Sequence, residues 1–161
     1  MAEENRPNAE KQLLLQKIYI KDFSFESPRA PAIFGTDVSP TTQLSIKSTA
    51  KELSPDTQEV TLTLTVEATD QDKTLFMVEI EQAGLFRMQG YSEEEQRMLI
   101  GSYCPGTLYP FAREAIADII TRGGFPQLLL QPINFDGLYA QAMKDGGNGN
   151  GGAAGTPEDT H

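Results

Sequence analysis

Residues 58–69 have the sequence QEVTLTLTVEAT, in which polar and apolar side chains alternate without interruption from Glu59 onward. Every second residue is apolar and would lie on one face of an extended chain: Val60, Leu62, Leu64, Val66 and Ala68. The opposite face would carry glutamates and threonines. One apolar and one polar face are typical of antiparallel sheets, so this stretch predicts a strand in such a sheet.

Strands are also predicted on both sides of this stretch. Three further ranges alternate in a similar way, at residues 17–27, 43–51 and 74–82. Ser54-Pro55-Asp56 and residues 70–73 are turn sequences that join the last three strands. Between the first two strands, three prolines and Gly35 exclude regular structure, and the segment is long for a hairpin loop. We therefore expect this segment to cross over other elements.

The first predicted strand, KIYIKDFSFES, combines aromatic and acidic residues. Strict alternation assigns one face to Tyr19, Lys21, Phe23 and Phe25. It assigns the other face to Ile18, Ile20, Asp22, Ser24 and Glu26. We therefore expect one aromatic face and one face that becomes acidic toward the end of the strand.

Helical periodicity replaces the strand pattern after the fourth strand. Ser92 followed by Glu95 is a capping-box pattern and predicts a short helix through about Gly101. Cys104-Pro105-Gly106 is expected to end or kink this helix, and Thr107 to cap a longer one. The longer helix has apolar residues at helical spacing, and a last helix is expected over about 135–143. These elements predict an α+β domain: a four-stranded antiparallel sheet with a long kinked helix and a short C-terminal helix.

The 161 residues suit one domain with a polar segment at each end. We expect a flexible N-terminus at 1–12, a folded domain at 13–145 and a disordered, Gly-rich acidic tail at 146–161. The N-terminus lacks the apolar core of a signal peptide, and no apolar run approaches the roughly 20 residues of a membrane span. We therefore expect a cytoplasmic protein that does not insert into membranes.

The composition argues against several functional classes. Lys and Arg number 13 against 23 Asp and Glu, and the resulting formal charge of -10 disfavours binding to nucleic acids. The single histidine is His161, the last residue, and the single cysteine is Cys104. Histidine-dependent triads and dyads, and metal sites of imidazole or thiolate ligands, are therefore excluded. We expect no catalytic residue, no metal, no cofactor and no enzymatic activity.

Large apolar side chains occupy both faces of the first and fourth predicted strands. Two helices cannot cover all of this area in a monomer of this size, which indicates an oligomer, a binding groove or both. We expect the oligomer interface at Phe76, Val78, Ile80, Ile116 and Ile119.

A series of motifs resembles the SecB family of bacterial protein-export chaperones. The motifs are Ile18–Pro28, Ala30-Pro31, Gly101–Pro105, Leu108–Glu114 (LYPFARE), Arg122–Leu128 (RGGFPQL) and Asn134-Phe135-Asp136. They extend from about residue 17 to 143, nearly the whole predicted domain. Each motif alone is weakly specific, but their joint order and spacing are highly specific.

The resemblance implies a cytoplasmic homotetramer, a dimer of dimers, that acts without ATP. It would hold unfolded precursor proteins in a translocation-competent state and deliver them to the motor SecA. The implied client-binding groove consists of Phe34, Val38, Leu44, Ile46, Leu138, Tyr139 and Met143. The implied SecA-binding patch, which would receive a basic C-terminal motif of SecA, consists of Asp22, Glu26, Met77 and Glu79.

Two alternatives remain open at this point. The chain could be a non-catalytic oligomeric binding protein without an export role, in which Asp22 and Glu26 are ordinary solvated carboxylates. It could also be a small acid-dependent hydrolase that uses Asp22, Glu26 or Glu79. Two features depart from the family pattern: the chain has no tryptophan near Val38, and Gly137 lies inside the last helix, where glycine costs about 1 kcal/mol relative to alanine.

Overall fold

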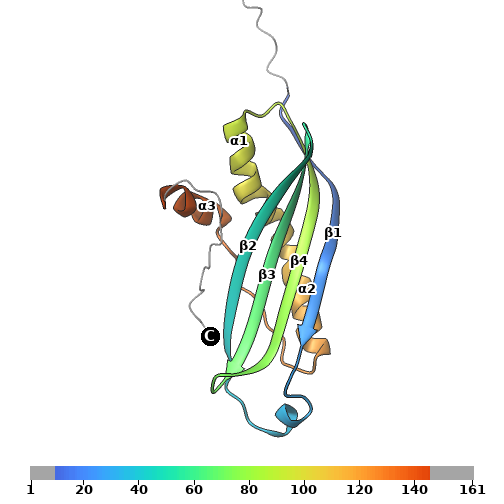
Figure 1. Cartoon of the computed structure of the whole chain (residues 1–161), viewed down its shortest axis with the longest axis vertical. Helices are drawn as coiled ribbons and strands as arrows, with labels where there is room; N and C mark the ends of the chain where they lie inside the picture. Colours follow the sequence, from blue (N-terminus) through green and yellow to red (C-terminus); the bar gives the residue numbers. More distant parts are fainter. Residues whose placement is uncertain (1–9, 146–161) are drawn as a thin grey trace, which may run out of the picture.

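The fold places a long helix across one face of an antiparallel sheet (Figure 1). A computed structural model describes residues 10–145. The predicted tail, 146–161, and most of the predicted flexible N-terminus, 1–12, lie outside the described residues. Within the described range, no helix is long and apolar enough to cross a membrane.

Within the described part of the chain, the sheet has the four strands that the alternation predicts. They are β1 (Gln12–Glu26), β2 (Thr41–Ser54), β3 (Thr57–Asp70) and β4 (Lys73–Gln89), all antiparallel, in the order β1-β4-β3-β2. Hairpins join β2 to β3 and β3 to β4, whereas β1 and β2 form opposite edges. The chain passes from one edge to the other at the end of the sheet shown at the bottom of Figure 1. The predicted crossover is confirmed, although it contains one turn of 3-10 helix, η1 (Ala32–Gly35).

β1 contains two β-bulges, at Gln16 and at Lys21. Because each bulge adds one residue to β1 alone, the alternation of its side chains is shifted at that point. The residues paired with the core positions of β4 are Ile18, Ile20, Phe23 and Phe25. The face assignment expected from strict alternation is therefore wrong for the first half of this strand. Tyr19 lies on the same face as Asp22, Ser24 and Glu26.

β4 continues to Gln89, beyond its predicted end at residue 82. Gly84 interrupts the apolar pattern, but the strand continues through it. The missing side chain at Gly84 lets the long helix approach the sheet closely. A Cβ atom on Gly84 would lie 2.9 Å from the ring of Phe86 and 3.0 Å from the side chain of Leu108. Phe86 and Met88 beyond the glycine are both buried, so the alternation resumes.

The helices begin with α1 (Glu93–Met98), continue through a π-helical turn, η2 (Leu99–Tyr103), and pass directly into α2 (Cys104–Arg122). Cys104-Pro105-Gly106 therefore starts α2 and does not end a helix, since proline is tolerated in a first turn. The predicted cap at Thr107 is wrong: its hydroxyl donates a hydrogen bond to the carbonyl of Tyr103, 2.8 Å away. The last helix, α3 (Phe135–Lys144), matches its prediction.

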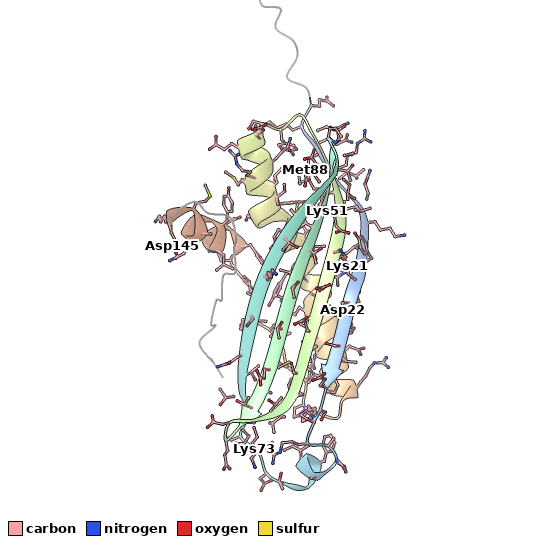
Figure 2. All side chains as sticks on the ribbon, viewed as in Figure 1. Lys21, Asp22, Lys51, Lys73, Met88 and Asp145 are labelled. Atoms are coloured by element: carbon pink, nitrogen blue, oxygen red, sulfur yellow. The ribbon has the colours of Figure 1, made fainter. Side chains whose placement is uncertain are left out.

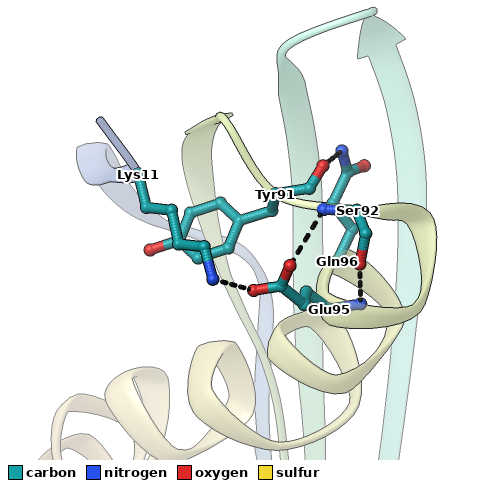
Figure 3. Close-up of polar contacts among 5 residues, drawn as sticks. All are labelled: Lys11, Tyr91, Ser92, Glu95 and Gln96. Carbon is teal, nitrogen blue, oxygen red and sulfur yellow. Dashed lines mark hydrogen bonds and ion pairs between the residues drawn. The ribbon is translucent and has the colours of Figure 1, made fainter. Parts of the chain in front are cut away.

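The predicted capping box forms in full at the start of α1 (Figure 3). The amide of Glu95 donates to the hydroxyl oxygen of Ser92 at 3.2 Å, and the amide of Ser92 donates to the carboxylate of Glu95 at 3.3 Å. The ammonium of Lys11, just before β1, also binds this carboxylate at 2.5 Å and lies 5.7 Å from the ring centroid of Tyr91. The hydrogen bond from Lys11 lowers the pKa of Glu95. The start of β1 is thus tied to the start of α1.

The hydrophobic core lies between α2 and the sheet, and α2 packs mainly on β4 and β3. Val78, Ile80 and Ile116 have 0% exposed area within the single chain, and Phe76 has 6%. The expected oligomer interface is therefore wrong for these four residues, because α2 covers this face of the sheet without help from a second chain. Ile119 is only partly buried against the core.

Candidate partner-binding and client-binding sites

The face of the sheet opposite α2, which we call the open face, is turned toward the viewer in Figure 1. Cross-strand partners in an antiparallel sheet share a face, so the register identifies the side chains on it. The register places these charged residues on it: Lys17, Asp22 and Glu26 on β1, Lys47 and Lys51 on β2, Glu59 and Glu67 on β3, and Glu79, Glu81 and Arg87 on β4. Lys21, at a bulge of β1, also reaches this face, where its ammonium binds Glu59. The open face is therefore polar and charged, in contrast to the apolar face under α2.

The four residues of the predicted SecA-binding patch all lie on the open face. Glu26 is directly opposite Met77, and Ser24 is opposite Glu79, so Asp22 and Glu26 of β1 lie beside Met77 and Glu79 of β4. The bulge at Lys21 is what brings Asp22 to this side, because unbroken alternation from Ile20 would turn it toward α2. At this bulge the side-chain amide of Gln82 donates to the carbonyl of Tyr19 at 3.0 Å.

Glu81 also belongs to this acidic surface, although it was not among the predicted site residues. It lies directly opposite Asp22, two residues after Glu79 on the same strand. Alternation along β4 could have identified it, because residues i and i+2 of a strand share a face. The acidic patch, defined here as Asp22, Glu26, Met77, Glu79 and Glu81, therefore holds four carboxylates.

Glu59 forms a separate polar cluster closer to the start of β1. The hydroxyl of Tyr19 donates a hydrogen bond to one carboxylate oxygen, and the ammonium of Lys21 donates to the other at 3.0 Å. These bonds, with Tyr19 contributing most, lower the pKa of Glu59. Burial, followed by the hydrogen bond to Glu59, raises the pKa of Tyr19 to about 12. Glu59 is therefore ionised and already paired with a cation at neutral pH.

The predicted groove residues on the crossover and β2 lie near the end of the sheet where β2 begins. Leu44 and Ile46 are buried on the α2 side of this edge strand, and Val38 is partly buried. Phe34 remains 52% exposed, and its ring centroid lies 5.4 Å from that of Phe125.

Sequence reasoning missed Phe125 as a neighbour of these groove residues. Its ring centroid lies 4.8 Å from that of Phe76 and 6.4 Å from that of Phe25. The preceding Gly124 has a positive φ of 88°, and a Cβ atom there would lie 3.1 Å from the ring of Phe34. Glycine thus allows the turn after α2 to pack closely on the crossover.

The groove residues on α3 form a second group near η2, away from the crossover (Figure 1). Leu138 and Tyr139 are partly buried, whereas Met143 is 57% exposed. The ring of Tyr139 fills the space beside Gly101, where a Cβ atom would lie only 2.3 Å from it. The hydroxyl of Ser102 also donates a hydrogen bond to the carboxylate of Asp136. α3 is therefore fixed to the π-helical turn through one ring and one hydrogen bond.

Gly137 fits the start of α3 closely. Its amide donates to the side-chain oxygen of Asn134 at 3.0 Å, which caps the helix. A Cβ atom on Gly137 would lie 2.8 Å from the amide nitrogen of the same side chain. The glycine that departs from the family pattern therefore makes room for the cap.

Cys104 has the surroundings of a core residue. It is fully buried, and burial raises the pKa of its thiol to about 12. Because the thiolate is the nucleophilic form, this cysteine is unreactive at neutral pH. The interpretation of Cys104 as a small buried apolar residue is confirmed.

A family model and the sequences of known proteins both match this chain over most of its length. The family model for the preprotein translocase subunit SecB matches residues 6–146. The protein-export protein SecB of Nitrosococcus oceani is 49% identical over 135 residues, which cover 83% of this chain and 82% of that protein. The protein-export protein SecB of Methylococcus capsulatus is 44% identical over 144 residues, covering 89% of this chain and 92% of that protein.

A solved structure shares the fold. The SecB-like chaperone of Mycobacterium tuberculosis, in complex with a peptide from an antitoxin, superposes with a TM-score of 0.63 at 21% sequence identity. The match covers 75% of this chain and 90% of that chain. Its sheet and helices therefore have the same arrangement as those described above.

Proposed function

The chain belongs to the SecB family, and from this membership we infer that it is a protein-export chaperone, which holds unfolded precursor proteins, and not an enzyme. The family match over residues 6–146 carries this conclusion. The acid-dependent hydrolase and the binding protein without an export role are set aside on the same ground. We further propose a cytoplasmic location.

We propose that clients bind along the β2 side of the molecule, at the predicted groove residues. Phe34 on the crossover and Met143 on α3 offer exposed apolar side chains there, at 52% and 57% exposure. Leu44, Ile46 and Val38 form an apolar base near the crossover, whereas α3 lies apart from it beside η2. Separate exposed apolar side chains suit the scattered apolar segments of an unfolded chain.

Suppression of aggregation is the experiment that tests this function. An unfolded precursor diluted from denaturant should scatter less light when the chain is present, with no nucleotide added. Phe34→Asp is expected to weaken the suppression several-fold, because a carboxylate replaces an exposed apolar contact at the groove. Met98→Asp, at an exposed residue of α1, is the matched control and should suppress aggregation as wild type does. Equal scattering with and without wild type would refute the function.

We propose that the acidic patch binds the basic C-terminal motif of SecA. The register places Asp22, Glu26, Met77, Glu79 and Glu81 side by side on the open face, and four carboxylates on one flat surface create a potential that attracts cations. Met77 adds an adaptable apolar contact beside them.

Charge reversal tests this patch. Asp22→Lys with Glu79→Lys should weaken binding of the SecA C-terminal peptide about tenfold or more and reduce its salt dependence, because the attracting charge is removed. Isothermal titration calorimetry measures both effects. Asp37→Lys with Glu52→Lys changes the net charge equally at exposed residues outside the patch and should bind nearly as wild type does. Equal losses in the two double variants would show that the net charge alone matters.

We propose that the protein assembles as a homotetramer, a dimer of dimers. Apolar side chains left exposed beside and on α2 support this: Ile20 at 47%, Phe23 at 37% and Phe111 at 50%, with Ile119 partly buried. Multi-angle light scattering should give four times the chain mass of 17.7 kDa. A mass equal to one chain would exclude the tetramer.

A further inference from the structure

We propose that the open face binds a partner segment of mixed charge, with a basic block over the acidic patch and an acidic block over the lysines of β2. The inference builds on the proposed partner patch and extends it to the other half of the same face. It predicts a second electrostatic contact and a fixed direction for the partner along the sheet.

The cationic half of the open face is centred on Lys47 and Lys51. Both are exposed on β2, opposite Thr63 and Glu59, and neither forms an ion pair with any residue in the described part of the chain. Lys51 is close enough to help lower the pKa of Glu59, but the carboxylate oxygens of Glu59 bind Tyr19 and Lys21 and form no ion pair with Lys51. Two unpaired ammonium groups thus share one edge of the open face in a chain whose formal net charge is -10.

The acidic patch forms the other half of the open face, and its carboxylates also lack ion-pair partners among the described residues. None of its four carboxylates forms an ion pair within residues 10–145. Glu79 accepts a hydrogen bond from the hydroxyl of Thr65 at 3.1 Å, which adds no charge. The open face therefore presents carboxylates where β1 ends and lysines on β2, and Lys17 of β1, in the same row as Lys51, adds positive charge near the latter. A partner with complementary blocks satisfies both halves.

The register gives the spacing between the two halves. Lys51 pairs with Glu59, and Glu59 pairs with Leu85, so Lys51 lies six residues along the sheet from the row of Glu79. At about 3.3 Å per residue, Lys51 is about 20 Å along the sheet from Glu79, the length of roughly six extended residues. Lys47 pairs with Thr63, and Thr63 pairs with Glu81, so Lys47 lies in the row of Glu81 and is separated from it by β3 alone. Figure 2 shows Lys51 and Lys21 nearer the start of β1 than Asp22. A uniformly basic peptide can engage only one half of this face.

Two synthetic peptides test the inference by calorimetry on the full chain. The first joins four lysines to four glutamates through about six glycine and serine residues, and the second carries glutamines in place of the glutamates. The glutamate peptide should bind wild type about fivefold more tightly, because each exposed charge pair contributes a small gain and both blocks act on one ligand. Lys47→Glu with Lys51→Glu should remove most of this advantage and leave the affinity for the glutamine peptide within about twofold.

Arg97→Glu with Lys144→Glu is the matched control. It changes the net charge equally at exposed residues on α1 and α3, and it should keep the fivefold advantage. If the glutamate block adds no affinity to wild type, or if its advantage survives the reversals on β2, the inference is wrong while the acidic patch stands.

Two further outcomes would also refute it. Failure of both peptides to bind would overturn the partner patch together with the inference. A change of mass in light scattering on reversal of Lys47 and Lys51 would show that a second copy of this chain covers the lysines of β2, and the inference would fail.

Discussion

Replacing Val78 with arginine is expected to unfold the chain, and not to divide an assembly into folded parts. Val78 is fully buried on β4, opposite Val66 on one side and Phe25 on the other. An unpaired guanidinium in this core should cost about 4 kcal/mol or more, a large part of the 5–15 kcal/mol that holds a typical domain together. Urea unfolding followed by circular dichroism measures this loss.

Met77→Arg provides the comparison at the next residue of the same strand. Met77 lies on the open face, where a long cationic side chain reaches water, so the free energy of unfolding should change by less than about 1 kcal/mol. If Val78→Arg instead gave a stable, folded chain of lower mass, the core position of Val78 described here would be wrong.

Replacing Gly101 with valine is expected to release α3 from η2 and to weaken client holding several-fold. The new side chain would occupy the place of the Tyr139 ring, which lies 2.3 Å from the Cβ position. Overpacking of this kind costs about 1–3 kcal/mol. A helix of ten residues is unstable in water without its packing, so α3 should unfold once it is released. Hydrogen exchange of the amides at residues 135–144 measures the release.

The double variant Gly101→Val with Tyr139→Ala separates the clash from a general loss of stability. Removing the ring makes space for valine, so the double variant should protect the amides of α3 better than Gly101→Val alone does. Such non-additivity is the signature of two residues in contact. Unchanged amide protection in Gly101→Val would contradict the close contact between η2 and α3.

The sequence predicted the strands well where neighbouring strands follow each other along the chain. β3 alternates without a bulge from Val60 to Ala68, and short turns connect it to β2 and β4, so local pattern and turn residues suffice. The capping box at Ser92 and Glu95 was predictable because every group in it lies within four residues. Local patterns of this kind depend little on the rest of the fold.

Other features depend on contacts that no local pattern reports. The bulges of β1 are defined only against β4, so the faces of Ile18, Tyr19 and Ile20 could not be assigned from β1 alone. The apolar face of β4 was predicted to be buried, but the pattern does not tell whether a helix or a second chain buries it. The packing of Phe125 on the crossover depends on a turn more than 80 residues away in sequence from Phe34.

The position of β1 in the sheet also affects the order in which the protein folds. β1 pairs with β4 from Gln12 opposite Gln89 to Glu26 opposite Met77, whereas β2, β3 and β4 pair through local hairpins. Because long-range pairs close later than local ones, we expect the three-stranded meander to form first and β1 to join it last. β1 leaves the ribosome before its partner is made, so during synthesis each new chain exposes an unpaired strand with apolar side chains. For that interval a newly made chain resembles the unfolded precursors that a chaperone of this family holds.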